Sequence, residues 1–421
     1  MTEKKKIFVI ADHPFAPSGV GTQTRYVIET LLKSGRYKFI CFGGAVKHEN
    51  YQPQKTQEWG DDLVVFPVNG YGTQEMVRSI LWNEKPDALW FMTDPRIYGW
   101  LWDMENEIRS QIPMIYYHVW DNYPYPKFNK NYYLSNDLIA TISKVTDDIV
   151  KTVAPEIESV YLPHSVNTEI FAPYDDNFIN NIISTNFKGE KRFRVFWNNR
   201  NARRKMSGSV LWWFNEWAEK VGPENVQLIM HTDPKDPNGQ DLEQIIHEIG
   251  ATDGRILISN NRAVSPTDLA IFYNVCDCTV NIADAEGFGL ATLESLACGT
   301  PIIVNMTGGL QEQVRDEEGN WFGVGIEPSS RTVIGSQEVP YIYEDRISKE
   351  DFHHALTTIY VMPKEQRKQW GFLGRQHVLK NYNFENFQKK WIDVFDNTLE
   401  KHGSWKNRKN YQSWELREIT P

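Results

Sequence analysis

Short apolar runs alternate with amphipathic stretches along most of this 421-residue chain, and this alternation limits the fold more than any other feature of the sequence. In the first half, helix-like stretches at 22–33, 74–84 and 145–153 lie between runs that have the length of β-strands. Parallel strands need crossover connections, which are usually helices, so the pattern predicts βαβ units and a mainly parallel sheet. The strands expected there are residues 7–10, 39–42, 63–66, 88–92, 114–117, 138–142 and 160–162.

A second series of the same kind begins after a polar, asparagine-rich stretch, residues 166–190, which we interpret as an interdomain linker. At about 100–200 residues per domain, two α/β halves are the simplest account of the length. The polar segment 328–349 is expected to be a loop insertion in the second half. The expected strands of this half are residues 193–197, 226–230, 256–258, 278–282 and 302–304, and the expected helices are 349–360, 364–379 and 384–399.

The composition narrows the class of protein. The formal net charge is −10, which argues against a chain-wide basic surface for nucleic acid but leaves a local basic patch open. The four cysteines show no metal-binding or disulfide spacing, which favours a reduced setting. The sequence contains no apolar run that approaches the roughly 20 residues needed to span a bilayer. We therefore expect an intracellular protein without stable membrane insertion.

Residues 276–314 carry the most informative pattern. The strand at 278–282 is followed by a loop with Glu286 and two glycines, and then by an apolar helical run with Glu294. In a parallel sheet, strand carboxyl ends and the following helix starts form the ligand crevice, where glycine gives access to the backbone and free N–H groups attract phosphate. Two carboxylates placed about two helical turns apart there suit hydrogen bonding to vicinal hydroxyls, as on a sugar and a ribose.

The motif Glu286-Gly-Phe-Gly-Leu-Ala-Thr-Leu-Glu294, followed by Ala-Cys-Gly-Thr-Pro and Gly308-Gly309, closely resembles the E-x7-E signature of retaining glycosyltransferases. This group includes glycogen synthases and bacterial mannosyl- and glucosyltransferases. Its architecture, GT-B, is an α/β fold of two Rossmann-like domains facing across a cleft. The resemblance implies that Glu286 contacts the donor sugar and that Glu294 binds the nucleotide ribose. The other residues expected to bind the donor here are Phe288, Gly289 and Leu290.

The resemblance also implies a division of the chain into domains. Residues 1–165 would form an N-terminal, Rossmann-like acceptor domain, and residues 191–380 a C-terminal, Rossmann-like domain for the nucleotide-sugar donor. Residues 381–421 would form a C-terminal helix that crosses back to the first domain, followed by a tail.

A cationic turn follows the strand at 193–197. Cations at the carboxyl end of a strand can neutralise a diphosphate and stabilise it as it leaves. The family carries an Arg and a Lys at this point, which maps to Arg200 and Lys205 as catalytic residues. Asparagines precede Arg200 where glycine is more usual, and we interpret Arg203 and Arg204 as surface residues.

In the first half, a glycine loop with Gly19 and Gly21 follows the first strand. It does not fit a dinucleotide-binding fingerprint, because Thr24 stands where the third glycine belongs. The resemblance implies that the two glycines let the backbone approach the phosphate or sugar of the donor. His118, at the end of the strand at 114–117, is expected to point into the cleft near the reaction centre, as a catalytic residue.

Together, these assignments imply a retaining, metal-independent glycosyltransferase that uses a nucleotide-diphosphate-sugar and needs no other cofactor. The acceptor hydroxyl would lie on a glycan or glycolipid, and the protein would be cytoplasmic or peripheral to a membrane. Three alternatives stay open. The first is a glycosyltransferase that acts on a hydroxymethylated DNA base, an alternative that the aromatic- and lysine-rich segment 120–133 keeps open. The second is a nucleotide-sugar epimerase, and the third is a non-catalytic binder of the same fold.

Overall fold

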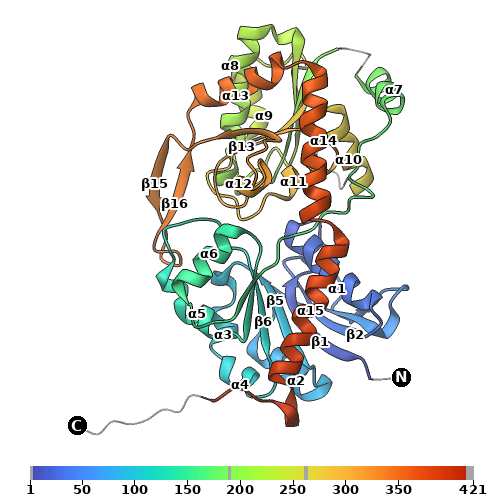
Figure 1. The fold of residues 1–421 in the computed structure, drawn as a ribbon, viewed down its shortest axis with the longest axis vertical. Coiled ribbons are helices and arrows are strands. Elements are labelled where there is room, and N and C mark those ends of the chain that lie inside the picture. Colours follow the sequence, from blue (N-terminus) through green and yellow to red (C-terminus); the bar gives the residue numbers. More distant parts are fainter. Residues whose placement is uncertain (1–2, 188–190, 260–263, 414–421) are drawn as a thin grey trace, which may run out of the picture. The chain divides into compact units, whose positions relative to one another are not determined.

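The computed structural model describes residues 3–187, 191–259 and 264–413. The chain divides into two compact units, each an α/β structure around its own sheet (Figure 1). Unit 1 comprises residues 1–165, 336–340 and 385–421, and unit 2 comprises residues 166–335 and 341–384. Among the described residues, no helix is both long enough and apolar enough to cross a membrane.

Unit 1 is built on an eight-stranded sheet with the order β3-β4-β2-β1-β5-β6-β7-β8. Its neighbouring strands run parallel except for β3, which is antiparallel to β4. This confirms the parallel sheet that the alternation predicts. The strands are β1 (Lys5–Asp12), β2 (Tyr37–Gly44), β3 (Gln54–Lys55), β4 (Leu63–Pro67), β5 (Ala88–Thr93), β6 (Met114–His118), β7 (Leu138–Thr141) and β8 (Ser159–Tyr161). The helices are α1 (Gly19–Lys33), α2 (Gln74–Glu84), α3 (Gly99–Trp102), α4 (Glu105–Arg109), α5 (Lys130–Leu134), α6 (Lys144–Val153) and, from Glu385 on, α15 (Phe384–His402).

Capping side chains set where the main helices of unit 1 begin. Ser18 accepts a hydrogen bond from the backbone N–H of Gly21 at the start of α1, and Ser143 does the same for Thr146 at the start of α6. Such caps satisfy backbone donors that have no partner within the helix. Both helices therefore start a few residues after the carboxyl ends of their strands.

Helix α15 completes the core of unit 1 although it follows unit 2 in the chain. Trp391 is fully buried, and its ring lies against Trp90, with centroids 5.8 Å apart, and against Tyr117, at 4.9 Å. At the outer end of the contact, Arg36 forms an ion pair of 2.8 Å with Asp396. The helix is thus an integral part of unit 1.

Unit 2 is built on a six-stranded sheet with the order β11-β10-β9-β12-β13-β14, and its paired strands are parallel. Every strand expected for this half is present, and β14 is an addition to them. The strands are β9 (Phe193–Asn198), β10 (Val226–His231), β11 (Ile256–Ser259), β12 (Cys278–Asn281), β13 (Ile302–Asn305) and β14 (Gly323–Ile326). The helices are α7 (Asp176–Asn186), α8 (Ser207–Val221), α9 (Leu242–Glu248), α10 (Pro266–Val275), α11 (Leu290–Ala297), α12 (Leu310–Gln313), α13 (Lys349–Val361) and α14 (Lys364–Asn381).

The segment 328–349 is an antiparallel hairpin, β15 (Ser330–Ile334) paired with β16 (Ile342–Arg346), so the expectation of a loop is wrong there (Figure 1). The hairpin was missed because its strands are rich in polar and charged residues, and four of the five residues of β15 are exposed. Apolar alternation, on which the other strands were predicted, is therefore weak in this segment.

The expected linker and tail have structure of their own. Within residues 166–187, α7 forms part of unit 2, and residues 188–190 lie outside the described residues. After α15, the indole N–H of Trp405 donates to the carbonyl of Pro86 over 2.8 Å, which attaches the start of the tail to unit 1. Residues 414–421 also lie outside the described residues.

Candidate functional site

The loops that follow three neighbouring strands of unit 2, β9, β12 and β13, carry most of the predicted site residues. The cationic turn follows β9, the loop with Glu286 follows β12, and Gly308-Gly309 follows β13. Because the three strands are parallel, these loops share one edge of the sheet, where ligands bind in open α/β folds.

Lys205 and Glu286 form a nearly buried ion pair at this edge. The ammonium of Lys205 donates to Oε2 of Glu286, and each side chain is 11% exposed. The amide Nδ2 of Asn281 donates to the same oxygen over 3.2 Å. Burial raises the pKa of Glu286, but the charges of Lys205 and Arg204 outweigh burial and lower the pKa overall. Glu286 is therefore an ionised carboxylate at neutral pH.

Glu294 is held differently. The hydroxyl of Tyr273, on α10, donates to Oε2 of Glu294 over 2.7 Å, and Nδ2 of Asn198 donates to that hydroxyl over 2.9 Å. Burial raises the pKa of Glu294 to about 7, against the opposing hydrogen bond from Tyr273. The pKa values of the two glutamates of one motif are thus shifted in opposite directions, because among the residues that the structure describes only Glu286 is paired with a cation.

Glycine is required where the loops after β12 and β13 meet. Gly289 has φ of +92°, and a Cβ there would lie 2.5 Å from Leu310. The N–H of Gly309 donates to the carbonyl of Glu286 over 3.0 Å, and a Cβ on Gly309 would lie 2.7 Å from the carbonyl oxygen of Gly287. Two backbone segments can approach this closely only without side chains.

The structure encloses Phe288 and leaves Leu290 partly accessible. Phe288 is 3% exposed, and its carbonyl accepts a hydrogen bond of 2.8 Å from Gln313. Leu290 is the first residue of α11. A contact of Phe288 with the donor stays a prediction. Because the ring is buried, it could touch the donor only if the surrounding loop moved.

Arg200 and Lys205 point to different partners. The guanidinium of Arg200 binds both oxygens of Asp236, at 2.6 and 3.2 Å, while its side chain stays 64% exposed. The bidentate pair lowers the pKa of Asp236 to about 2. Arg200 is therefore accessible at the outer side of the turn, whereas Lys205 is enclosed by the loop after β12.

Sequence reasoning missed the role of Arg204. Its guanidinium donates to the carbonyl of Ala285 over 2.6 Å, and its own carbonyl accepts from the N–H of Asp284 over 2.8 Å. Arg204 therefore binds the cationic turn to the loop that contains Glu286, a role that the surface interpretation did not include, and its side chain is half-buried. Within the run Arg203-Arg204-Lys205, no local signal separates a bridging arginine from an exposed one. Arg203 is indeed exposed, with 62% of its side chain accessible, but it is paired with Glu344.

In unit 1, the two predicted glycines lie at the start of α1. Gly19 is its first residue, and a Cβ on Gly21 would lie 2.8 Å from the carbonyl of His13. The hydroxyl of Ser18, which caps the helix, donates to Asp12 over 2.6 Å. The loop after β1 is therefore tightly folded on itself.

His118 lies at the end of β6 and is fully buried. Its Nδ1 is 3.1 Å from the hydroxyl of Tyr116, and its Nε2 is 2.8 Å from the hydroxyl of Tyr133. Burial lowers the pKa of His118 to about 3, so the ring is neutral. A catalytic role stays a prediction, and it requires Tyr116 or Tyr133 to move aside.

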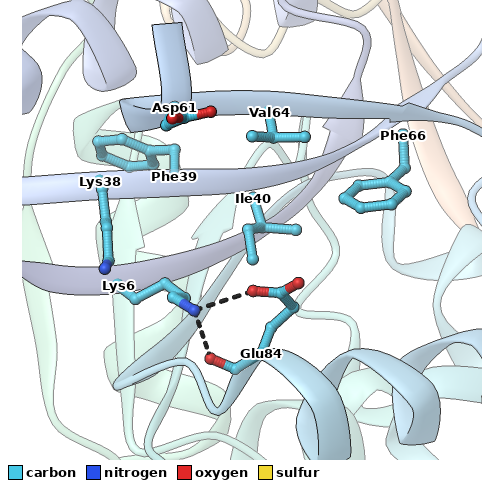
Figure 2. Close-up of a pocket in the computed structure, with 8 residues that line it drawn as sticks. All are labelled: Lys6, Lys38, Phe39, Ile40, Asp61, Val64, Phe66 and Glu84. Carbon is cyan, nitrogen blue, oxygen red and sulfur yellow. Dashed lines mark hydrogen bonds and ion pairs between the residues drawn. The ribbon is translucent and has the colours of Figure 1, made fainter. Parts of the chain in front are cut away.

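A separate cavity of about 230 Å³ lies at the amino ends of β1, β2 and β4 in unit 1, the edge opposite to that of the glycine loop (Figure 2). The ammonium of Lys6 there donates to the carbonyl of Glu84 over 2.6 Å and to its carboxylate over 2.9 Å. None of the predicted site residues lines this cavity. Its lining residues are Lys6, Lys38, Phe39, Ile40, Asp61, Val64, Phe66 and Glu84.

Part of the chain is similar in sequence to known glycosyltransferases. Residues 235–371, which belong to unit 2 except for residues 336–340, match the model of the family described as glycosyl transferases group 1. D-inositol 3-phosphate glycosyltransferase from Acidothermus cellulolyticus is 34% identical over 88 residues, which is 21% of this chain and 19% of the relative. The chain spans only 19% to 30% of the length of the first curated relatives that it matches.

Solved structures match nearly the whole chain. Sucrose-phosphate synthase from Thermosynechococcus elongatus matches with a TM-score of 0.74 and 16% identity, over 94% of this chain and 100% of that one. The Anabaena protein HepE in complex with UDP and glucose matches with a TM-score of 0.68 and 13% identity, over 94% and 100%. The chain therefore has the GT-B fold, and the family match supports the group 1 glycosyltransferases over the residues that it covers.

Proposed function

We propose that this protein is a retaining glycosyltransferase that moves a sugar from a nucleotide-diphosphate-sugar to an acceptor hydroxyl. The observation that carries the proposal is the buried pair of Lys205 and Glu286 beside the glycine loops of unit 2. Buried charged groups with shifted pKa values cluster at functional sites, and this pair lies at the sheet edge where ligands bind in open α/β folds. The family match over residues 235–371 supports the same reading.

In this proposal, binding of the donor breaks the ion pair between Lys205 and Glu286, and each side chain then binds a group of the donor. The incoming diphosphate takes the ammonium of Lys205, and the carboxylate of Glu286 becomes an acceptor for sugar hydroxyls. Arg200 contributes from the outer side of the turn by turning from Asp236 to the diphosphate. Glu294, oriented by Tyr273, accepts from the ribose hydroxyls. Gly19 and Gly21 are proposed to approach the donor with their backbone, and Leu290 to border it.

Catalysis would rest on charge. As the bond from the anomeric carbon to the diphosphate breaks, negative charge grows on the leaving oxygen, and Lys205 and Arg200 stabilise it where it appears. The proposed substitution takes place on one face of the sugar, with the leaving phosphate accepting the proton of the acceptor hydroxyl. In this proposed mechanism, side chains neutralise the charge of the leaving diphosphate, without a metal ion or further cofactor.

The proposed acceptor is a glycan or glycolipid. The names of similar proteins support an acceptor that carries several hydroxyls, since they include a D-inositol 3-phosphate glycosyltransferase and a sucrose-phosphate synthase. The complex of HepE with UDP and glucose supports a uridine nucleotide as the first donor to try.

The test is a panel of nucleotide sugars with the full chain. Thermal shift identifies the donor, because a bound ligand stabilises the folded protein by mass action. Release of nucleoside diphosphate then measures turnover, and proton NMR of the product gives the anomeric configuration. We expect Lys205→Ala to lower turnover by about 10²–10³-fold, with the exposed Lys364→Ala as matched control. Normal turnover of Lys205→Ala would contradict the proposed role of Lys205. A product with inverted anomeric configuration would contradict the proposed retaining mechanism.

A further inference from the structure

Strand β16 crosses the carboxyl ends of β9, β12 and β13, the three strands whose loops form the candidate site. It does so with two adjacent acidic residues, Glu344 and Asp345, whose side chains are 2% and 3% exposed. Neighbouring residues of a strand point to opposite faces, so the two carboxylates reach different loops.

Asp345 fastens the loops after β12 and β13. Its N–H donates to the carbonyl of Asp284 over 2.8 Å. Its carbonyl accepts from Nδ2 of Asn305 over 2.6 Å, and the same amide donates to the carbonyl of Ala283 over 2.8 Å. One carboxylate oxygen of Asp345 accepts from the hydroxyl of Thr307 over 2.8 Å. A single residue thus joins the loop that precedes Glu286 to the loop that precedes Gly308-Gly309.

Glu344 fastens the cationic turn after β9. The guanidinium of Arg203 donates to its Oε1, and that of Arg346 donates to its Oε2 over 2.8 Å. Burial raises the pKa of Glu344, but the two arginines outweigh burial and lower it. Arg203 begins the short 3₁₀ turn that ends at Lys205. The carboxylate therefore holds the first residue of the turn whose last residue binds Glu286.

The contacts close a triangle among three segments. The cationic turn and the loop after β12 bind each other through Arg204, and β16 binds the turn through Glu344 and the loop through Asp345. Asp284, at the junction, is buried, and its Oδ2 makes no hydrogen bond among the described residues, although Nε of Arg346 lies 3.8 Å away. Burying an oxygen without a hydrogen bond costs free energy, so other contacts must hold the loop around Asp284 in place.

We propose that β16 is a brace for the candidate site, with Glu344 and Asp345 as positioning residues for Lys205 and Glu286. Its catalytic meaning rests on the proposed glycosyl transfer, but the brace itself is a property of the fold. A loosened brace lets the cation and the carboxylate drift apart, and misplacement by about 1 Å costs about 100-fold in rate. Donor affinity suffers less, because Glu294 and Arg200 bind without help from β16.

The first experiment compares Glu344→Gln and Arg203→Met, singly and together, with the exposed Glu327→Gln as matched control. We expect each single variant to lower kcat by about 10- to 100-fold with a KM change below about threefold. The double variant should be no worse than the singles, since either change removes the same pair. Additive losses, or an unchanged kcat in Glu344→Gln, would overturn the brace.

A second measurement does not depend on activity. Hydrogen exchange of the full-length protein should become faster at residues 203–206 and 283–286 in Glu344→Gln and in Asp345→Asn, and stay unchanged in the core strands of unit 2. Unchanged loops, or faster exchange throughout unit 2, would contradict a local brace. If the wild type transfers no sugar but its loops respond as expected, the proposed function fails while the brace stands.

Discussion

The hydroxyl of Tyr273 lies 2.7 Å from Oε2 of Glu294 and fixes which way that carboxylate faces. The same hydroxyl accepts from Asn198, the last residue of β9, so the orientation is set by the sheet itself. Tyr273 is fully buried, so its hydroxyl has no contact with water. Helix α10 thereby determines the geometry of a group on α11.

Tyr273→Phe should weaken binding of the nucleotide without disturbing the sheet. The variant loses the hydrogen bond that orients Glu294, and we expect the misplaced carboxylate to lower nucleotide affinity by roughly tenfold. Calorimetric titration with the nucleoside diphosphate measures the loss, and Tyr360→Phe serves as the control because its ring packs in the same unit. Equal affinity of Tyr273→Phe and the wild type would mean that Glu294 does not need the hydroxyl of Tyr273 for its orientation.

Nucleotide affinity should depend on pH through Glu294. With a pKa of about 7, this carboxyl is largely protonated at about pH 6 and ionised at about pH 8. Only the ionised group accepts freely from ribose hydroxyls, so affinity should rise over this interval. Glu294→Gln should bind more weakly and show a flatter profile, and an unchanged slope in that variant would place the titration elsewhere.

The raised pKa of Glu294 also predicts a stability effect of the opposite sign. The folded protein holds this proton more tightly than an unfolded chain, in which the pKa is 4.5. The free energy of unfolding should therefore fall as pH rises from about 4.5 to about 7. Thermal unfolding of the wild type and Glu294→Gln across that range separates this contribution from the rest.

Acid should destabilise unit 1 through its buried histidines. Burial lowers the pKa of His118 and of His164 to about 3, compared with 6.5 in an unfolded chain. Between these values the unfolded chain binds more protons, so stability is lost as pH falls below about 6.5. His118→Gln should reduce the slope of the unfolding free energy against pH, as measured by urea titrations. A slope that stays the same would show that His118 does not titrate on unfolding.

Gly289→Ala should damage the loop of the site more than the fold. The substitution places a side chain at φ of +92° and 2.5 Å from Leu310, for a cost of about 1–3 kcal/mol. We expect loss of donor binding with a small fall in melting temperature. Gly250→Ala is the control, because Gly250 also has positive φ but open space around its Cβ position. Donor affinity as high in Gly289→Ala as in Gly250→Ala would show that the loop tolerates the added side chain.

Trp391→Ala should destabilise unit 1 by about 3–5 kcal/mol, the usual cost of emptying a buried aromatic site. Chemical denaturation followed by circular dichroism measures the change. The neighbouring exposed Lys389→Ala should leave stability almost unaltered. A small effect of Trp391→Ala would mean that α15 contributes little to the core.

Local sequence pattern predicted most strands of both sheets because these strands are largely buried and therefore read as apolar runs, whereas the exposed strand β3 was missed. It placed Lys205 and Glu286 at one sheet edge, since parallel strands bring their carboxyl ends together. It did not predict that the two bind each other, because they are 81 positions apart and no periodicity links them. Tyr273 was missed for the same reason, as its partners lie on other elements.

Charged contacts were the hardest feature to predict. Nothing in the sequence of β16 distinguishes buried Glu344 and Asp345 from an exposed polar strand, because they are also paired with Arg203 and Arg331, which come from other segments. For His118, the sequence predicted the position of the residue but not its surroundings. The strand-end rule located the residue, but the enclosing hydroxyls come from Tyr116 and Tyr133, whose side-chain directions no sequence pattern specifies.

The position of Trp391 has a consequence for biosynthesis. When residues 1–165 leave the ribosome, Trp90 and Tyr117 lack the indole that packs against them, and they stay without it until α15 has been translated. Unit 2 can reach its native packing before that moment, whereas the nascent first unit waits with part of its apolar interior uncovered. The half of the protein that is made first is therefore the half that finishes folding last.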